Sequence, residues 1–151
     1  MKALLKTITV LVIFGILSGA ALAQFSKPED AIKYRQSVMF VIAQHFGRLG
    51  AMVKGKQPYD QMTFASNTAV IEALSGLAWE AFLVPGSDRG KTTMKSNVLK
   101  NPEDLKGLAQ NFETEVGKLS AAARAGDFKA AKARFGAVAQ SCKSCHSKTR
   151  K

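Results

Sequence analysis

Near the C-terminus, two cysteines and a histidine stand at a spacing that suits covalent attachment of a cofactor. Cys142 and Cys145 are three residues apart, and His146 follows directly. On a helix, residues i and i+3 lie on one face about one turn apart, so both thiols can add to the two vinyl groups along one edge of a porphyrin. The adjacent imidazole can then reach the iron, and the motif therefore predicts a c-type haem site.

Three other chemistries use cysteines in related patterns. A structural disulfide gives no reason for the histidine after the second cysteine, and a thioredoxin-like pair is expected beside a strand-helix-strand pattern, which we do not find in the sequence. A zinc site would need a fourth ligand, such as the distant His45, to complete a tetrahedron. Covalent haem accounts for all three residues of the motif, so the sequence favours it.

The first 23 residues have the pattern of a secretory signal peptide. Two lysines precede an apolar run over residues 8–17, and Ala21-Leu22-Ala23 matches a small-x-small cleavage pattern, with cleavage expected between Ala23 and Gln24. The apolar run is short for a membrane span, and a polar helix start follows it. We therefore expect an exported protein that does not span the membrane and that resides in a bacterial periplasm, where haem attachment consumes reduced cysteines.

The expected mature domain, residues 24–151, is basic. The formal net charge of the chain is +11, and Lys2 and Lys6 of the signal peptide contribute two of these charges. A basic protein in this compartment can meet acidic redox proteins or anionic lipid, but no residue pattern identifies the redox partner. Nucleic acid is not expected, because the lysines are scattered and no aromatic stacking platform is interleaved with them.

Four amphipathic helices account for most of the mature domain. We expect them from a capping box at Ser26-Lys27-Pro28-Glu29 to about Val53, from near Asp60 to about Phe82, from an Asn101 cap to Gly126, and from an Asp127 cap through the haem motif. Their apolar residues recur at alternating spacings of three and four. A polar loop over 87–100 separates the second from the third helix and has room for a helical turn. The pattern predicts an all-α, antiparallel four-helix bundle whose last helix holds the covalently attached haem.

The face of the iron opposite His146 decides what the haem can do, because an open face binds a ligand and a protein ligand there makes an electron carrier. Arg35 occupies an apolar position of the first helix and is interpreted either as a counter-ion for a haem propionate or as a side chain that reaches solvent. Met39, one turn later, either packs over the iron or ligates it. A bis-histidine site, or the distal base of a peroxidase, would require His45 to face inward.

The mature chain resembles the cytochromes c′ of the class II c-type cytochromes. The resemblance rests on the haem motif, on residues 27–37, on His45-Phe46-Gly47 and on residues 53–60. It implies a four-helix bundle, usually a homodimer, with one covalent haem c per chain. It also implies five-coordinate, high-spin iron that binds nitric oxide and carbon monoxide and can exchange one electron, in a protein that is not an enzyme.

The resemblance also implies roles for individual residues. The expected haem contacts are Arg35 and Gln36 at the propionates, Thr92 in the loop, Met39, Trp79 and Phe82 in the distal pocket, and Arg150 on the proximal side. The chain departs from the family just after His146, where Ser147 and Thr149 replace an acid and an aromatic residue that are frequent there. The alternative to the open iron is a low-spin electron carrier in which His146 and Met39 are both ligands.

Overall fold

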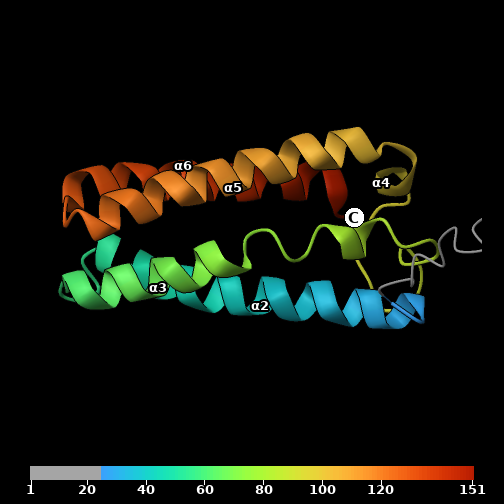
Figure 1. The fold of residues 1–151 in the computed structure, drawn as a ribbon, viewed down its shortest axis with the longest axis horizontal. Helices are drawn as coiled ribbons and strands as arrows, with labels where there is room; N and C mark the ends of the chain where they lie inside the picture. Colours follow the sequence, from blue (N-terminus) through green and yellow to red (C-terminus); the bar gives the residue numbers. More distant parts are fainter. Residues whose placement is uncertain (1–24) are drawn as a thin grey trace, which may run out of the picture.

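The computed structural model describes residues 25–151; the expected signal peptide and its cleavage site lie outside the described residues. The long helices are α2 (Pro28–Val53), α3 (Gln61–Leu74), α5 (Pro102–Arg124) and α6 (Phe128–Thr149), and the short ones are η1 (Glu80–Phe82) and α4 (Asn97–Lys100). The α2–α3 pair and the α5–α6 pair lie side by side along the long axis (Figure 1). The predicted four-helix bundle is confirmed. Among residues 25–151, no helix combines the length and apolarity that a membrane crossing requires.

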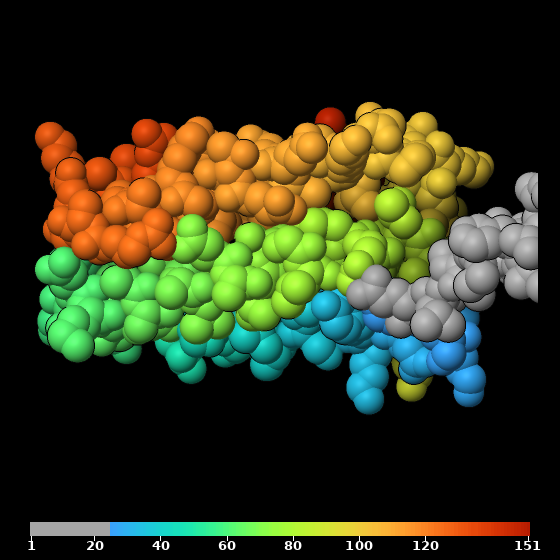
Figure 2. All heavy atoms as spheres, in the orientation of Figure 1, coloured from blue at the N-terminus to red at the C-terminus, as the bar shows by residue number. Residues whose placement is uncertain are grey.

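The core lies between the four long helices and is built from the residues at the three-and-four spacing. All four helices supply side chains that are at most 1% exposed, namely Leu49, Phe64, Ile71, Val116, Leu119 and Val138. Burial of one such side chain contributes about 1.5–3 kcal/mol. The space-filling view shows the side chains of α3 and α5 packed along the front of the bundle (Figure 2).

The first long helix has the predicted bounds but not the predicted capping box. Its N-cap residue is Lys27, with no side-chain capping bond, and the Ser26 hydroxyl instead donates to the Asp30 carboxylate at 3.2 Å. The helix begins at Pro28 because proline at the first position has no N–H to satisfy. Glu29 and Asp30 in the first turn complement the positive end of the helix dipole.

The second long helix is shorter than predicted, since α3 ends at Leu74 rather than near Phe82. The Ser75 hydroxyl donates to the Glu72 carbonyl at 2.8 Å, a local bond that competes with the helix. Gly76 follows and is a poor helix former, so the helix ends here. The chain then runs in turns to η1, toward the end of the bundle where α6 finishes (Figure 1). Trp79 and Phe82 are therefore presented by an irregular segment.

The connection between α5 and α6 is as short as predicted. Gly126 has a φ of +72°, and the Asp127 carboxylate accepts from the Ala130 N–H at 2.9 Å, which caps α6. Asn101 is the N-cap residue of α5, as predicted, but its side chain donates to the Asn97 carbonyl at 3.2 Å and makes no capping bond.

The long polar loop contains the expected helical turn, α4, and is fixed against the end of α6. The Lys95 N–H donates to the Thr149 carbonyl, and the Lys151 N–H donates to the Thr93 carbonyl, both at 2.8 Å. Met94 and Arg150 form an antiparallel bridge between these two bonds. The loop is therefore held beside the cysteine-histidine motif.

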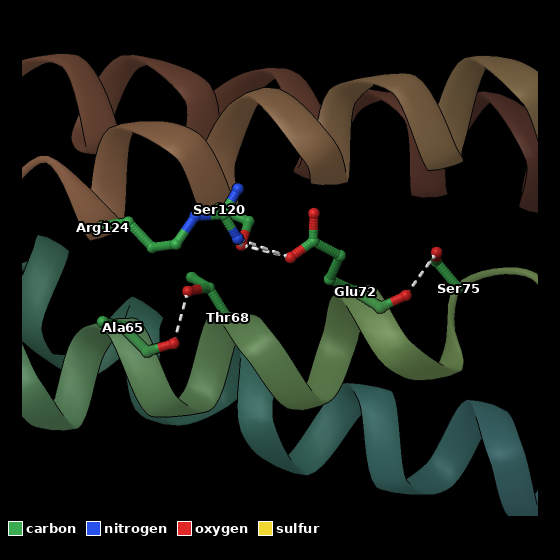
Figure 3. Close-up of polar contacts among 6 residues, drawn as sticks. All are labelled: Ala65, Thr68, Glu72, Ser75, Ser120 and Arg124. Atoms are coloured by element: carbon green, nitrogen blue, oxygen red, sulfur yellow. Dashed lines mark hydrogen bonds and ion pairs between the residues drawn. The ribbon is translucent and has the colours of Figure 1, made fainter.

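A polar group also links α3 to α5 within the bundle (Figure 3). The Glu72 carboxylate accepts from the Ser120 hydroxyl at 2.5 Å and from the Arg124 guanidinium at 2.9 Å. Both bonds lower the pKa of Glu72, the Ser120 bond more than the Arg124 bond.

Candidate haem site

A largely apolar cavity of about 410 Å³ opens beside the cysteine-histidine motif. Its walls come from α2, from the segment before η1, from α5 and from α6. Cys142, Cys145 and His146 border the cavity, and its apolar lining includes Met39, Ile42, Phe46, Trp79, Phe112 and Val138. The volume lies within the range of roughly 300–1,000 Å³ found for cofactor and ligand sites.

A smaller space of about 90 Å³ adjoins the apolar cavity and is lined by more polar side chains. Arg35, Gln36 and Thr92 line only this second space, whereas Met39, Cys145, His146 and Arg150 border both. Phe82 borders the second space as well. The combined site thus has an apolar body and a polar end, which matches a planar apolar ring that carries two carboxylates.

The last two turns of α6 place both cysteines at the cavity wall. Cys142 and Cys145 are free and half-buried, and burial is the largest cause of the raised pKa of each thiol. Both thiols are therefore unpaired, as addition to a vinyl group requires. Within residues 25–151, no group of three or more His, Cys, Asp or Glu side chains is arranged to hold a metal ion, so the structure offers no support for zinc.

His146 borders both parts of the site. Burial first, and the nearby Arg150 second, lower the pKa of its imidazole. The neutral imidazole that results is the form that ligates a metal. The motif as a whole therefore fits a covalently attached haem, with two thiols on one wall and one neutral imidazole in reach of the same space.

Arg35 is 3% exposed and is held by the loop opposite α2. Its two terminal nitrogens donate to the Ala81 carbonyl and the Ser87 hydroxyl, both at 2.9 Å, to the Ser87 carbonyl at 2.6 Å, and to the Thr92 hydroxyl at 2.9 Å. Its guanidinium lies over the Phe82 ring, 5.0 Å from the centroid. Four of its five N–H donors are thus committed to the protein, and one, on Nε, remains for a ligand.

Burial is the main cause of the lowered pKa of Arg35, and the charge of Asp88 acts in the opposite direction. The alternative in which Arg35 reaches solvent is wrong, because the side chain is 3% exposed and four of its five N–H donors bond to the protein. The sequence did not reveal the role of Ser87, which is 0% exposed and supplies two of the acceptors.

Gln36 and Thr92 lie where the resemblance places them, beside the polar end of the site. The Gln36 amide donates to the Lys91 carbonyl at 2.9 Å, and the Thr92 hydroxyl accepts from the Met94 N–H at 3.1 Å as well as from Arg35. Both side chains therefore fix the loop and border the space at the same time.

Trp79 and Phe82 form an aromatic wall. Their ring centroids are 6.1 Å apart, and Trp79 also makes an edge contact with Phe112 at 5.9 Å. The indole Nε1 of Trp79 is buried and has no hydrogen-bond partner in the described part of the chain. Because this nitrogen is shielded from water although the tryptophan borders an open cavity, we conclude that Trp79 presents ring carbons to the cavity.

Several apolar residues of the site were not predicted as site residues. Ile42 and Phe46 follow Met39 on the same face of α2, and Phe46 stacks on Phe135 of α6 at 4.2 Å between ring centroids. Both positions fit the three-and-four spacing of apolar residues in the first helix, but that spacing alone does not distinguish a core residue from a cavity wall.

His45 does not border the haem site. Its Nδ1 lies 2.8 Å from the side-chain oxygen of Asn67, whose amide donates to the Thr63 carbonyl at 2.7 Å. This contact explains why an asparagine occupies an inward position of α3. The geometry supports neither a bis-histidine iron site nor a peroxidase base at His45.

The fold and the site together define a class: a four-helix bundle whose last helix carries a c-type haem motif beside an apolar cavity. The family model described as Cytochrome C' matches residues 30–150. The cytochrome c′ of Alcaligenes xylosoxydans xylosoxydans is 44% identical over 128 residues, which cover 85% of this chain and 98% of the relative. That of Rubrivivax gelatinosus is 45% identical over 126 residues, which cover 83% and 97%.

Solved structures agree with these sequence relationships. The crystal structure of Rubrivivax gelatinosus cytochrome c′ has a TM-score of 0.80 at 44% identity, covering 85% of this chain and 100% of that one. The Shewanella frigidimarina protein has a TM-score of 0.81 at 35% identity, covering 85% and 99%. The chain belongs to the cytochrome c′ family, whose members carry one covalent haem c per chain.

Proposed function

We propose that this chain is a haem protein in which His146 is the only axial ligand from the protein and the opposite face of the iron binds nitric oxide or carbon monoxide. The observation that carries the proposal is the placement of both thiols and one imidazole at a single apolar cavity that no second histidine borders. A nitric oxide complex and a nitrosyl complex are known for variants of the Alcaligenes xylosoxidans protein, which is 44% identical to this chain.

The haem supplies an iron that binds a diatomic ligand and changes its charge by one electron. The protein holds it through thioethers to Cys142 and Cys145 and through His146. Arg35, by its Nε–H, and Gln36, Thr92 and Arg150 are the groups available to the haem carboxylates. Because four donors of Arg35 are already engaged, it offers one bond rather than a bidentate clamp.

The apolar wall favours nitric oxide and carbon monoxide over dioxygen. Met39 and the carbon face of Trp79 would offer no N–H or O–H to a ligand of the haem, and dioxygen depends on such a donor in the pocket more than nitric oxide or carbon monoxide does. We therefore expect stable nitric oxide and carbon monoxide complexes of the ferrous protein and no stable dioxygen complex.

The second candidate is a low-spin electron carrier in which Met39 is the sixth ligand. It is kept because Met39 and His146 border the same two spaces. A relative named cytochrome c-554, from Cereibacter sphaeroides, is 26% identical to this chain, compared with 44% and 45% for the two cytochromes c′ above. Two cytochromes c′ also match at 27% and 24% identity, so experiment rather than identity separates the two candidates.

The spin state of the iron separates the two candidates. Absorption and electron paramagnetic resonance spectra at neutral pH should show high-spin ferric and ferrous iron, and Met39→Leu should leave both spectra unchanged while retaining the side-chain volume. Low-spin six-coordinate spectra in the wild-type protein that become high-spin in Met39→Leu would establish the electron carrier instead.

We also propose a periplasmic homodimer. Phe40 and Val41 on α2 and Met62 on α3 are 64%, 37% and 82% exposed, so these helices carry apolar surface that a second copy can cover. Analytical ultracentrifugation should give a dimer for the wild-type holoprotein and a shift toward monomer for Phe40→Lys.

Mass spectrometry of protein secreted with its own leader should place the mature N-terminus at Gln24.

A further inference from the structure

The positive charge of the chain is concentrated in two segments, the loop before α5 and the end of α6. The segments 88–100 and 143–151 contain eight basic residues and one acid, a net of +7, whereas residues 25–151 as a whole carry +9. We call these eight residues the basic face: Arg89, Lys91, Lys95, Lys100, Lys143, Lys148, Arg150 and Lys151. The second segment also contains Cys145 and His146, so the face and the haem motif share the same stretch of chain.

The fold assembles the basic face from two distant segments. The Lys95 and Lys151 N–H bonds to Thr149 and Thr93 join the segments, and the Lys95 ammonium donates to the Ser147 carbonyl at 3.0 Å. Seven of the eight side chains are exposed, and Lys95 is half-buried. The three ion pairs found among the described residues lie on α3 and α5 and include none of these eight residues. Asp88 is the one acid of the two segments, and a hydrogen bond with Ser96 first, then the charges of Arg89 and Lys151, lower the pKa of its carboxyl. The positive charges that exceed this one acid repel one another, which costs stability that a partner of opposite charge would recover.

The composition of the basic face points to an acidic protein rather than a membrane. The exposed large apolar residues of the described chain are Phe40, Val41, Met62, Leu77 and Leu83, and none lies in the two segments. A basic surface that inserts into lipid carries such side chains among its lysines. Neither segment contains Phe, Tyr or Trp on which nucleic-acid bases could stack, and His146 belongs to the haem motif.

We propose that the basic face is the docking surface for a carboxylate-rich redox protein, which exchanges one electron with the haem. The inference rests on the one-electron capacity of the proposed function but not on nitric oxide binding. In the exchange, ferrous haem loses one electron to an oxidised acceptor centre of the partner, and the acceptor is reduced by the same electron. Opposite charges at close range raise the rate of encounter by about 10- to 1,000-fold, and salt weakens the effect.

Oxidation of the ferrous holoprotein by hexacyanoferrate(III) tests the electrostatic part. The variant Lys91→Glu/Lys148→Glu reverses two charges on the face, and the matched control Lys129→Glu/Lys132→Glu makes the same change at the other end of α6, roughly 25 Å away. At low ionic strength we expect a rate about 3- to 10-fold lower for the first variant and less than 2-fold lower for the control. Equal losses would mean that only net charge matters and would overturn the proposal.

Carbodiimide coupling to poly-L-glutamate identifies the surface and the class of partner. Amide bonds located by peptide mass mapping should fall on Lys91, Lys95, Lys143 and Lys148 rather than on Lys129 and Lys132, and high salt should abolish them. Coupling spread over all exposed lysines would overturn the proposal. So would co-sedimentation with phosphatidylglycerol vesicles at a concentration where poly-L-glutamate does not bind. Both coupling and sedimentation can be read whatever the spin state of the iron.

Discussion

At the scale of single residues, Arg35 is the side chain whose role the structure changes most. As a propionate counter-ion it would matter mainly to the haem, but its four bonds to Ala81, Ser87 and Thr92 make it the link between α2 and the loop. Its neighbour Gln36 makes one bond to the same loop from an exposed position. The two residues therefore form a natural pair for comparison.

We predict that Arg35→Met lowers the free energy of unfolding by about 3 kcal/mol or more, because buried acceptors lose charged partners. Gln36→Ala should cost at most about 1 kcal/mol, since the freed Lys91 carbonyl can bond water. Urea titration of both holoproteins measures the difference. Equal costs for the two variants would contradict the role assigned to Arg35.

The haem motif yields a second prediction at this scale. His146→Ala should retain covalent haem poorly and lose the native absorption spectrum, because the imidazole is the protein's axial ligand. Pyridine haemochrome analysis and absorption spectra check both effects. A variant with full haem content and an unchanged spectrum would refute the assignment.

At the scale of the elements, the α5–α6 turn requires glycine at Gly126, and Gly136 within α6 serves as a matched control. Gly126 has a φ of +72°, and a Cβ added there would lie 2.6 Å from the Gln61 amide nitrogen. A Cβ added at Gly136, within α6, would meet nothing within 4 Å. Gly126→Ala should destabilise by about 1–2 kcal/mol, and Gly136→Ala should stabilise by about 0.5–1 kcal/mol. Thermal unfolding followed by circular dichroism tests whether the two substitutions change the stability in opposite directions.

The contact between α3 and α5 makes a small, pH-dependent contribution. The pKa of Glu72 is lowered in the folded state, so its stabilisation is present above its ordinary pKa of about 4.3 and is lost as the pH falls through the lowered value. Because Glu72 and Arg124 are 38% and 59% exposed, Glu72→Gln should cost only about 0.5–1 kcal/mol at pH 7. The cost should decrease as the pH is lowered below about 4.3 in urea titrations; a cost independent of pH would contradict the ionic origin.

The spacing of the apolar residues predicts the four long helices and their order along the chain. It does not predict where the second of these helices ends. The apolar pattern predicts a second helix that continues to about Phe82, yet α3 stops at Leu74 because Ser75 and Gly76 favour a local turn. Arg35 and Met39 were recognised as unusual on an apolar seam. Ser87 was not, because its partner is 52 residues away in the chain and no local pattern marks it.

At the scale of the whole molecule, the cavity makes the fold depend on its cofactor. Without haem, the apolar lining of a space of about 410 Å³ is left without the ring that would pack against it, so the bundle loses the burial that the haem provides. We predict that Cys142→Ser/Cys145→Ser, purified without haem, loses its near-ultraviolet circular dichroism while keeping much of its helix content. A cooperative, native-like thermal transition in that variant would contradict the prediction.

The arrangement of the attachment points has a consequence for refolding. Cys142 and Cys145 lie on one turn of α6, so haem bound through both stays tethered to a single short segment when the remaining helices separate. The refolding chain then meets its cofactor at an effective concentration on the order of millimolar, set by chain length. Dilution, which strips a dissociable cofactor, leaves this one in place, and recovery of the native state is expected to follow first-order kinetics.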